Sequence, residues 1–325
     1  MQRLHARVHA IRQLAQGIHE FDLRSSDGKA WPAASAGAHI DIFLPNGLVR
    51  SYSLTNPSGD AHGYTCAVSL EPASRGGSAY MHQNLRVGDC LEISAPRNTF
   101  PLNEAAARSV FIAGGIGITP LWSMIQRLAA LGKRWELYYS ARSPEVAAYT
   151  ANAAVLASQS QGHVALNFDE GEKDRRLDIA AIVESCPGDA HLYCCGPVPM
   201  LQAFEAACVS RDPDTVHREY FSAPVCSPST SAQANDQQEF RVVLSRANIT
   251  LAVKGGMSIL DAVLDAGVDV PYSCMNGVCR SCETRVLSGT PDHRDLVLSD
   301  AERNSGATMI ICCSGAKSDE LILDL

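Results

Sequence analysis

The chain has 325 residues, a formal net charge of −8, and 46% hydrophobic and 19% charged residues. This length exceeds what one ordinary core fills, so two or three domains of a soluble globular protein are expected. The acidic balance argues against nucleic acid or a membrane surface as a partner. Because the sequence has neither a run of eighteen apolar residues nor an apolar signal region at its start, it predicts a cytoplasmic protein.

Residues 1–104 alternate short apolar runs with Gly, Pro and Asn, which predicts an antiparallel β-barrel. Within it, Arg50-Ser51-Tyr52-Ser53 fits the R-x-Y-S pattern of the ferredoxin–NADP reductase superfamily. On an exposed strand, Arg50 would offer a cation to a phosphate, Tyr52 a flat face to an isoalloxazine ring, and Ser53 a hydroxyl to its polar edge. An ordinary barrel strand with polar and aromatic faces explains this motif alone equally well.

Arg75-Gly76-Gly77-Ser78 is a second candidate binding segment of the barrel. Its two glycines expose consecutive backbone N–H groups, and a helix start is expected after them, which together suit a phosphate. A bare Gly-Gly turn is more often a loop, but beside Arg50 the segment predicts a cradle for a flavin phosphate.

Residues 105–221 are predicted to form an α/β nicotinamide domain with a parallel sheet. A buried strand breaks into the turn Gly114-Gly115-Ile116-Gly117, and a helix should follow with Thr119 as N-cap and Pro120 at its first position. Such a unit places backbone amides where a pyrophosphate binds. The turn is not the G-x-G-x-x-G fingerprint, so it is a weak signal alone.

Two later strand ends support this interpretation. Arg142 follows the strand predicted over Trp135–Ser140, where an adenosine ribose would lie. Cys195-Gly196-Pro197 follows another strand, before a helix expected from about Pro199, at the crevice where open α/β sheets bind ligands. Cys195 has the alternative role of a small residue packing the strand end, and that role fits Cys194 better.

The segment His217–Phe221 closes the predicted nicotinamide domain. Glu219 is a candidate hydrogen-bonding group near the site of hydride transfer, and Phe221 a candidate cover for the flavin. A closing strand with one packed aromatic residue is an equally good explanation. Residues 222–238 are rich in Ser, Ala, Pro and Gln, which predicts a flexible linker.

Residues 239–325 carry Cys274, Cys279 and Cys282 in the spacing C-x4-C-x2-C, with Cys312 and Cys313 far downstream. This is the plant-type ferredoxin pattern for a [2Fe–2S] cluster, whose fourth ligand is one of the two distant cysteines. Ordinary buried cysteines are the weaker alternative. Twelve cysteines in a large cytoplasmic chain favour metal ligands and scattered thiols over a disulfide framework.

Together these motifs resemble the phthalate dioxygenase reductase family, and within it the reductases of vanillate O-demethylase type. The resemblance runs nearly end to end and implies a flavin barrel, a nicotinamide domain and an α+β plant-type ferredoxin (β-grasp) domain, with FMN and NADH. It implies Cys312 as the fourth cluster ligand, Cys313 in an apolar position, and Gly315 where the family has arginine. Pro291–Asp295 matches the family as an exposed turn without an assigned role.

The resemblance also implies that a separate Rieske-type non-haem iron oxygenase accepts the electrons. NADH delivers two electrons at once and a [2Fe–2S] cluster accepts one, so a flavin between them is expected to divide the pair. Two alternatives stay open: a reductase for another acceptor such as a haem monooxygenase, and a ferredoxin-like carrier without NADH turnover of its own. A monomer is expected.

The predicted cluster domain is acidic. Residues 239–325 hold twelve Asp and Glu against eight Lys and Arg, a net charge of 8 − 12 = −4. This charge suggests that the domain docks on a basic patch of the oxygenase.

Overall fold

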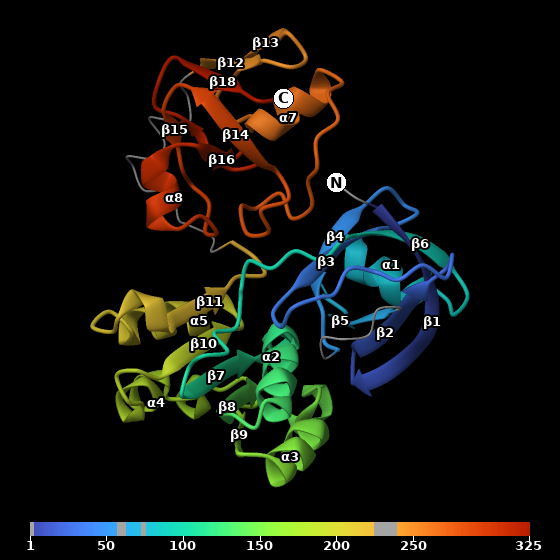
Figure 1. The fold of residues 1–325 in the computed structure, drawn as a ribbon, viewed down its shortest axis with the longest axis vertical. Helices are drawn as coiled ribbons and strands as arrows, with labels where there is room; N and C mark the ends of the chain where they lie inside the picture. Colours follow the sequence, from blue (N-terminus) through green and yellow to red (C-terminus); the bar gives the residue numbers. More distant parts are fainter. Residues whose placement is uncertain (1–2, 57–62, 73–75, 224–238) are drawn as a thin grey trace. The chain divides into compact units, whose positions relative to one another are not determined.

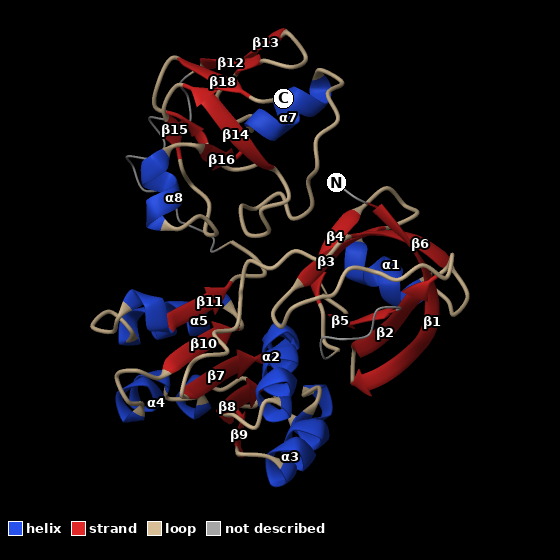
Figure 2. Ribbon diagram, in the orientation of Figure 1, coloured by secondary structure: helices blue, strands red, loops and turns tan. Residues whose placement is uncertain are grey.

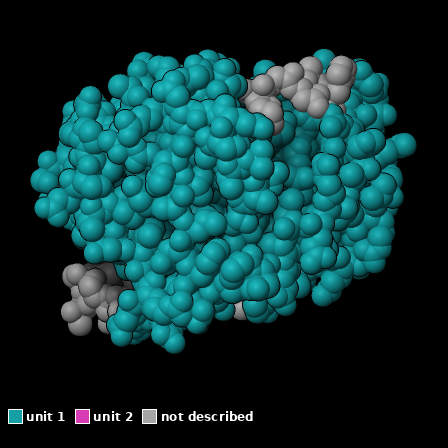
Figure 3. Space-filling view, turned by 90° about the horizontal axis from the view of Figure 1, so that it is seen from below, with its two compact units in different colours: residues 1–220 teal, residues 221–325 magenta. Residues whose placement is uncertain are grey.

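The computed structural model describes residues 3–56, 63–72, 76–223 and 239–325, which are coloured in Figure 1. Figure 2 shows a mixture of strands and helices in the described parts of the chain. The chain divides into two compact units, Met1–Tyr220 and Phe221–Leu325, and Figure 3 shows the surface of the first in teal. Arg75 and residues 224–238 of the predicted linker lie outside the described residues.

The first unit begins with an antiparallel sheet of six strands in the order β4-β3-β6-β1-β2-β5. An isolated bridge between Leu54 and Cys66 joins the two edge strands, so the sheet closes into the barrel that the sequence predicts. Alternate residues such as Phe21, Leu23 and Ile40 point inward and are fully buried. The barrel elements are β1 (Arg3–Ala15), β2 (Ile18–Ser25), β3 (His39–Phe43), β4 (Val49–Ser53), β5 (Gly63–Ser69), α1 (Gly77–Gln83) and β6 (Cys90–Ser94).

A five-stranded parallel sheet in the order β11-β10-β7-β8-β9 forms the rest of this unit. From the central strand β7 the chain first adds β8 and β9 on one side and later β10 and β11 on the other (Figure 1). The point between β7 and β10 is therefore a topological switch point, where α/β sheets bind ligands. The strands are β7 (Arg108–Gly114), β8 (Arg134–Ala141), β9 (Gly162–Phe168), β10 (His191–Cys195) and β11 (Val216–Glu219).

Helices connect these parallel strands, as βαβ crossovers require. The longest, α2, has an apolar side of residues such as Leu121, Ile125 and Leu128 that is completely buried. The helices are α2 (Ile118–Ala130), α3 (Thr150–Gln159), α4 (Ile179–Ser185) and α5 (Val198–Ala207), with short 3-10 turns η1 (Gly115–Gly117), η2 (Pro144–Val146), η3 (Lys173–Arg175) and η4 (Pro213–Thr215).

The barrel and the parallel sheet of the first unit are joined by direct hydrogen bonds. The backbone N–H of Gly37 donates to Ser123 Oγ at 3.0 Å, and Gln126 Nε2 donates to the Thr55 carbonyl at 2.7 Å. Gly37 has a φ of +89°, and a Cβ there would lie 2.1 Å from the Phe100 carbonyl oxygen. Only glycine therefore allows this close approach.

The second unit is built on a mixed sheet in the order β13-β12-β18-β14-β16, in which β12 and β18 are parallel. The two helices among its described residues each start with a capping box, formed by Ser258 with Asp261 and by Ser299 with Glu302. This is the expected α+β ferredoxin fold. Its elements are β12 (Phe240–Leu244), β13 (Ile249–Val253), α7 (Ile259–Asp265), β14 (Glu283–Ser288), β15 (Pro291–Asp292), α8 (Asp300–Ser305), β16 (Thr308–Ile310), β17 (Gly315–Ala316) and β18 (Glu320–Leu323).

Among the described residues, every helix is too short or too polar to cross a lipid bilayer.

Candidate functional site

The predicted phosphate cradle of the barrel lies where strand β4 meets helix α1. A Cβ on Gly77 would fall 2.6 Å from Cγ and Nε of Arg50, so the missing side chain lets Arg50 lie across the start of the helix. Gly76, with a φ of +88°, turns the chain into the helix. Ser78 Oγ accepts a hydrogen bond from the Glu71 N–H at 3.2 Å. The structure thus brings together Arg50 and both glycines, as the sequence predicts.

Strand β4 is half-buried, not exposed as expected. Its antiparallel pairing places Tyr52 opposite Ile40 and Ser53 opposite His39 on β3. The Tyr52 ring packs against the barrel core, and burial raises the pKa of its hydroxyl far above the ordinary value. Tyr52 therefore stays neutral and offers an apolar ring surface, which is what stacking on a flavin requires.

The glycine turn after β7 and the end of β10 touch each other at the switch point. A Cβ on Gly117 would lie 2.2 Å from the Cys195 carbonyl oxygen, and one on Gly114 would lie 2.6 Å from Cδ of Pro197. The equivalent atom on Gly196 would lie 3.0 Å from Cα of Gly114. The two segments can approach this closely only because these positions lack side chains, and their bare backbones line one end of the sheet.

The predicted helix cap at Thr119 is wrong. The turn residues Gly115–Gly117 form a 3-10 helix that continues directly into α2, which begins at Ile118 with Gly117 as its N-cap. Thr119 therefore already lies in the first helical turn, where its buried hydroxyl donates to the Ile116 carbonyl at 2.9 Å. Pro120 is the third helical residue, not the first.

Arg142 lies exposed immediately after β8, at the predicted ribose position. Its backbone carbonyl accepts a hydrogen bond from the Glu170 N–H at 2.9 Å, and the Asp169 N–H donates to Ala141 at 3.1 Å. An acidic turn containing Asp169, Glu170 and Glu172 thus sits beside Arg142. The sequence reading missed this turn, although its three carboxylates directly follow the next strand.

Cys195 and Glu219 are paired across the parallel strands β10 and β11, at the same end of the sheet. Glu219 is partly exposed as a residue, but its Oε2 atom is buried and has no hydrogen-bond partner among the described residues. Burial raises the pKa of the Glu219 carboxyl to about 8. A carboxyl with such a perturbed pKa at a switch point is a candidate functional group.

The two adjacent cysteines of β10 are both completely buried. Burial, and then the Glu219 charge, raise the pKa of the Cys195 thiol well above its ordinary value, which disfavours its thiolate form. The pKa of the Cys194 thiol is also raised by burial, with smaller effects from Cys208 and Glu205, so Cys194 faces different neighbours. Phe221 is 42% exposed and begins the second unit.

The four predicted cluster cysteines come together in the second unit. The antiparallel register Glu283↔Ile310 of β14 and β16 brings the residue before β14 next to the residues after β16, so the Ile311 N–H points to the Cys282 carbonyl at 3.5 Å. The thiols of Cys282 and Cys312 lie close enough to interact with each other, and those of Cys274 and Cys279 form a second pair. Cys274 also contacts Cys312.

This arrangement in two pairs suits two irons that each take two thiolates. In the described parts of the chain, no three His, Cys, Asp or Glu side chains are arranged to hold a single metal ion. Mutual hydrogen bonding and burial raise the pKa of the Cys279 and Cys282 thiols above the ordinary value. Binding of metal must therefore displace protons from these thiols.

The loop of the first three cysteines coils through residues with positive φ: Met275, Gly277 and Arg280. This backbone turns an amide toward the sulfurs, and the Asn276 N–H donates to Cys274 Sγ at 3.3 Å. Arg280 also binds Glu283 at 2.9 Å and Glu302 at 2.7 Å, which fixes the loop to α8. Amide-to-sulfur hydrogen bonds tune the potential of such a cluster.

Cys313 occupies a different environment from Cys312. Its Sγ packs on the cluster loop, because a Cβ on Gly277 would lie only 2.6 Å from it. It also lies 3.7 Å from the Ile310 carbonyl and 3.8 Å from Ser314 Oγ. Both Cys274 and Cys282 contact Cys312, whereas Cys313 contacts Cys312 and interacts with Cys274 only electrostatically. The contacts thus favour Cys312 as a ligand and Cys313 as a packing residue.

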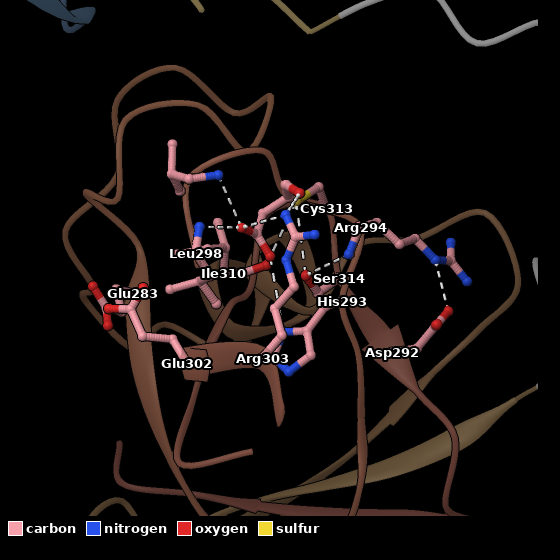
Figure 4. A network of polar contacts seen from close by, with 12 residues as sticks. Glu283, Asp292, His293, Arg294, Leu298, Glu302, Arg303, Ile310, Cys313 and Ser314 are labelled. Atoms are coloured by element: carbon pink, nitrogen blue, oxygen red, sulfur yellow. Dashed lines mark hydrogen bonds and ion pairs between the residues drawn. The ribbon is translucent and has the colours of Figure 1, made fainter. Parts of the chain in front are cut away.

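The turn Pro291–Asp295 is not the exposed turn that the sequence predicts. The side chain of Asp295 is 0% exposed and that of His293 is 10% exposed. The turn lies inward because β15 pairs with β17, which begins two residues after Cys313. Figure 4 shows Arg294 of this turn beside Ser314. This burial could not be predicted because the segment is polar in composition.

Two family models match parts of this chain. A model of the oxidoreductase NAD-binding domain matches residues 111–206, and a model of the 2Fe-2S iron-sulfur cluster binding domain matches residues 242–317. The chain is 52% identical to a phenoxybenzoate dioxygenase subunit beta of Ectopseudomonas oleovorans, over 98% of this chain and 96% of the relative. It is 42% identical to a vanillate O-demethylase oxidoreductase of Pseudomonas sp. (strain HR199 / DSM 7063), over 98% of both chains.

Two solved structures are similar over 99% of this chain. One is phthalate dioxygenase reductase, a modular structure for electron transfer from pyridine nucleotides to [2Fe–2S], with 36% identity, a TM-score of 0.72 and 98% of that chain covered. The other is an intact type IV self-sufficient cytochrome P450 monooxygenase, with 35% identity and a TM-score of 0.87. Of that longer chain only 41% is covered.

Proposed function

This chain belongs to the phthalate dioxygenase reductase family, and on that premise we propose that its electron acceptor is a Rieske-type oxygenase component that acts on an aromatic acid or ether. The chain is an NADH-dependent oxidoreductase that passes electrons through FMN to a [2Fe–2S] cluster. One observation supports the proposal most: a nicotinamide-type switch point and a four-thiol site occur in one chain, whose full-length relatives are named as dioxygenase and O-demethylase components.

We assign the flavin phosphate to Arg50 and to the amides of Gly76, Gly77 and Ser78, which lie beside it. The Tyr52 ring and the Ser53 hydroxyl would hold the ring system. Bound FMN supplies the means to accept two electrons and release them singly. The contribution of this chain is to hold the two ring systems together and exclude water between them.

The nicotinamide nucleotide is assigned to the switch point. The bare backbone of Gly114, Gly115 and Gly117, with Thr119 in the first turn of α2, would carry the pyrophosphate. The segment Cys195-Gly196-Pro197 would border the nicotinamide, and the protonated Glu219 carboxyl could donate a hydrogen bond there. Phe221 is proposed as the aromatic cover of the flavin.

The acidic turn beside Arg142 supports NADH over NADPH. Asp169 and Glu170 hydrogen-bond through their backbones to the end of β8, so their charges border the proposed ribose position. A 2′-phosphate there would meet these carboxylates, whereas a ribose diol can donate hydrogen bonds to them.

For the cluster we propose that Cys274 and Cys279 hold one iron and that Cys282 and Cys312 hold the other. The limits 1–104, 105–221 and 239–325 of the three functional domains, the cytoplasmic location, the monomeric state and docking through an acidic surface stay predictions.

The second candidate function is a reductase for a haem monooxygenase. It is favoured by the likeness of this chain, over 99% of its length, to the P450 structure, of which it matches 41%. The activity of that longer protein is not assigned to this chain. A carrier without NADH turnover is disfavoured by the intact contact between Gly117 and Cys195.

The test begins with the absorption spectrum of purified full-length protein before and after anaerobic addition of NADH. Flavin and iron–sulfur bands that bleach together support the proposal, whereas bands that NADH leaves unchanged support the carrier alternative. The reduced protein is then mixed with a Rieske oxygenase and, separately, with a P450 haem domain. Rapid reoxidation by the oxygenase alone is expected, and reoxidation by the haem protein alone would overturn the proposed acceptor.

A further inference from the structure

We propose that Asp295 is a positioning residue of the iron–sulfur site, which clamps the cluster loop at Gly277 and lowers the reduction potential of the cluster through its buried negative charge. This inference rests on the proposed function in one respect, namely that the four converging cysteines hold a [2Fe–2S] cluster.

The segment that carries Asp295 is fastened to both parts of the cluster site. On one side, the Leu296 N–H donates to the carbonyl of Gly277 in the cluster loop at 3.0 Å. On the other, the Arg294 N–H donates to Ser314 Oγ at 3.2 Å, two residues after Cys312 (Figure 4). The segment therefore ties the three-cysteine loop to the strand that supplies the fourth cysteine.

Gly277 is the point where these parts meet. It has a φ of +71°, and a Cβ there would lie 2.6 Å from Cys313 Sγ and 3.2 Å from Cα of Asp295. The cluster loop therefore passes between Cys313 and the backbone of Asp295 in direct contact with both. A movement of Asp295 would be transmitted to the loop between Cys274 and Cys279.

The Asp295 carboxylate fixes the shape of its own turn. Its Oδ1 atom accepts hydrogen bonds from the N–H groups of Val297 at 3.1 Å and Leu298 at 2.8 Å. Because the side chain is 0% exposed, these bonds are shielded from water. An asparagine would keep the Oδ1 acceptor, while an uncharged NH2 group would replace Oδ2 and the negative charge would be lost.

The negative charge of this carboxylate is only partly compensated. Arg303 Nη2 lies 3.7 Å from Oδ1 and donates its hydrogen bond to the Asp295 main-chain carbonyl instead, at 2.6 Å. His293 Nδ1 lies 3.8 Å from Oδ2, and neither Oδ2 nor either His293 ring nitrogen has a hydrogen-bond partner among the described residues. Unpaired buried polar atoms are costly, so their presence needs an explanation.

The position of the charge supplies that explanation. Reduction adds one electron to a site whose cysteines are buried or half-buried, and the Asp295 carboxylate acts electrostatically on Cys313 beside it. A fixed negative charge at this place opposes reduction, and the positive charge of Arg303 favours it. Removal of the Asp295 charge must therefore raise the reduction potential, and removal of the Arg303 charge must lower it. A loop that is merely loosened would instead shift the potential of both variants in the same direction.

The test measures the reduction potential of the cluster in full-length holoprotein by redox titration followed by electron paramagnetic resonance. The variants are Asp295→Asn and Arg303→Gln, with Asp319→Asn as control because Asp319 is an exposed carboxylate of the same unit. Iron and sulfide contents are determined for each. We expect a higher potential for Asp295→Asn, a lower one for Arg303→Gln and no shift for the control.

Shifts of the same sign in the two test variants, or no shift in either, would overturn the inference. If Asp295→Asn retains no iron, Arg303→Gln decides alone: a lower potential supports the charge effect, and an unchanged or higher one refutes it. A wild-type protein without iron and sulfide would instead refute the cluster assignment, which separates failure of the proposed function from failure of this inference.

Discussion

The buried carboxyl of Glu219 predicts that the stability around strand β11 depends on pH. Burial raises its pKa from 4.5 to about 8, so the folded state holds a proton that the unfolded state releases. The stabilisation from this proton is fully present below about pH 4.5 and is lost as the pH rises to about 8. At about 1.36 kcal/mol for each pH unit, the loss reaches about 5 kcal/mol as an upper bound.

The substitution Glu219→Gln removes this ionisation and keeps the size of the side chain. We expect the variant and the wild type to be similarly stable near pH 5, and the variant to be more stable near pH 9 by up to about 5 kcal/mol. Hydrogen exchange with mass spectrometry of the peptide that contains β11 measures this difference in the full-length protein, because both proteins are compared at the same pH.

A matched control is Glu184→Gln, which removes an exposed carboxyl from the same parallel-sheet region. It should leave the pH dependence unchanged. The reasoning fails if the stability of the β11 peptide differs between Glu219→Gln and the wild type by the same amount at pH 5 and pH 9. That result would mean that the Glu219 carboxyl is already ionised at pH 5 in the folded state.

Three further experiments test the proposed sites. Gly117→Ala would place a Cβ 2.2 Å from a backbone oxygen of β10. The rate of flavin reduction by NADH should therefore fall by about a hundredfold in stopped-flow measurements. The control Gly188→Ala, whose Cβ would meet nothing within 4 Å, should not change this rate. Cys312→Ser should abolish the iron–sulfur absorption bands and Cys313→Ser should retain them; the reverse result would exchange their roles. Asp169→Asn keeps the acceptor for the Gly171 N–H but removes a charge, so kcat/KM for NADPH relative to NADH should rise by about tenfold, and an unchanged ratio would exclude this turn from cofactor selection.

The order of domains and the cluster loop could be predicted from sequence because their signals are local. The spacing from Cys274 to Cys282 specifies a ligand loop without reference to the rest of the chain. The glycines of the turn after β7 likewise predict that another backbone approaches closely there, but they do not predict that this backbone is that of Cys195. The residue types alone could not reveal that this turn is a 3-10 helix, which is why Thr119 was wrongly placed as a cap.

The features that escaped prediction depend on register between distant segments. Asp295 lies in a polar stretch that is typical of an exposed turn, and its burial follows from the pairing of β15 with β17. The acidic turn at Asp169 becomes relevant to Arg142 only because β9 lies beside β8 in the sheet. Cys312 and Cys313 have different neighbours at the end of β16, because Cys313 packs against Gly277 of the cluster loop.

The position of β18 in the second sheet has a consequence for how the cofactor is acquired. This strand lies between β12 and β14, although it follows both of them in the chain. During synthesis the sheet therefore has a gap at its centre until residues 320–323 have left the ribosome. The pair formed by Cys282 and Cys312 depends on the same sheet through β14 and β16. Insertion of iron and sulfide is thus expected to require β18, and chains truncated before β18 should not acquire the cluster.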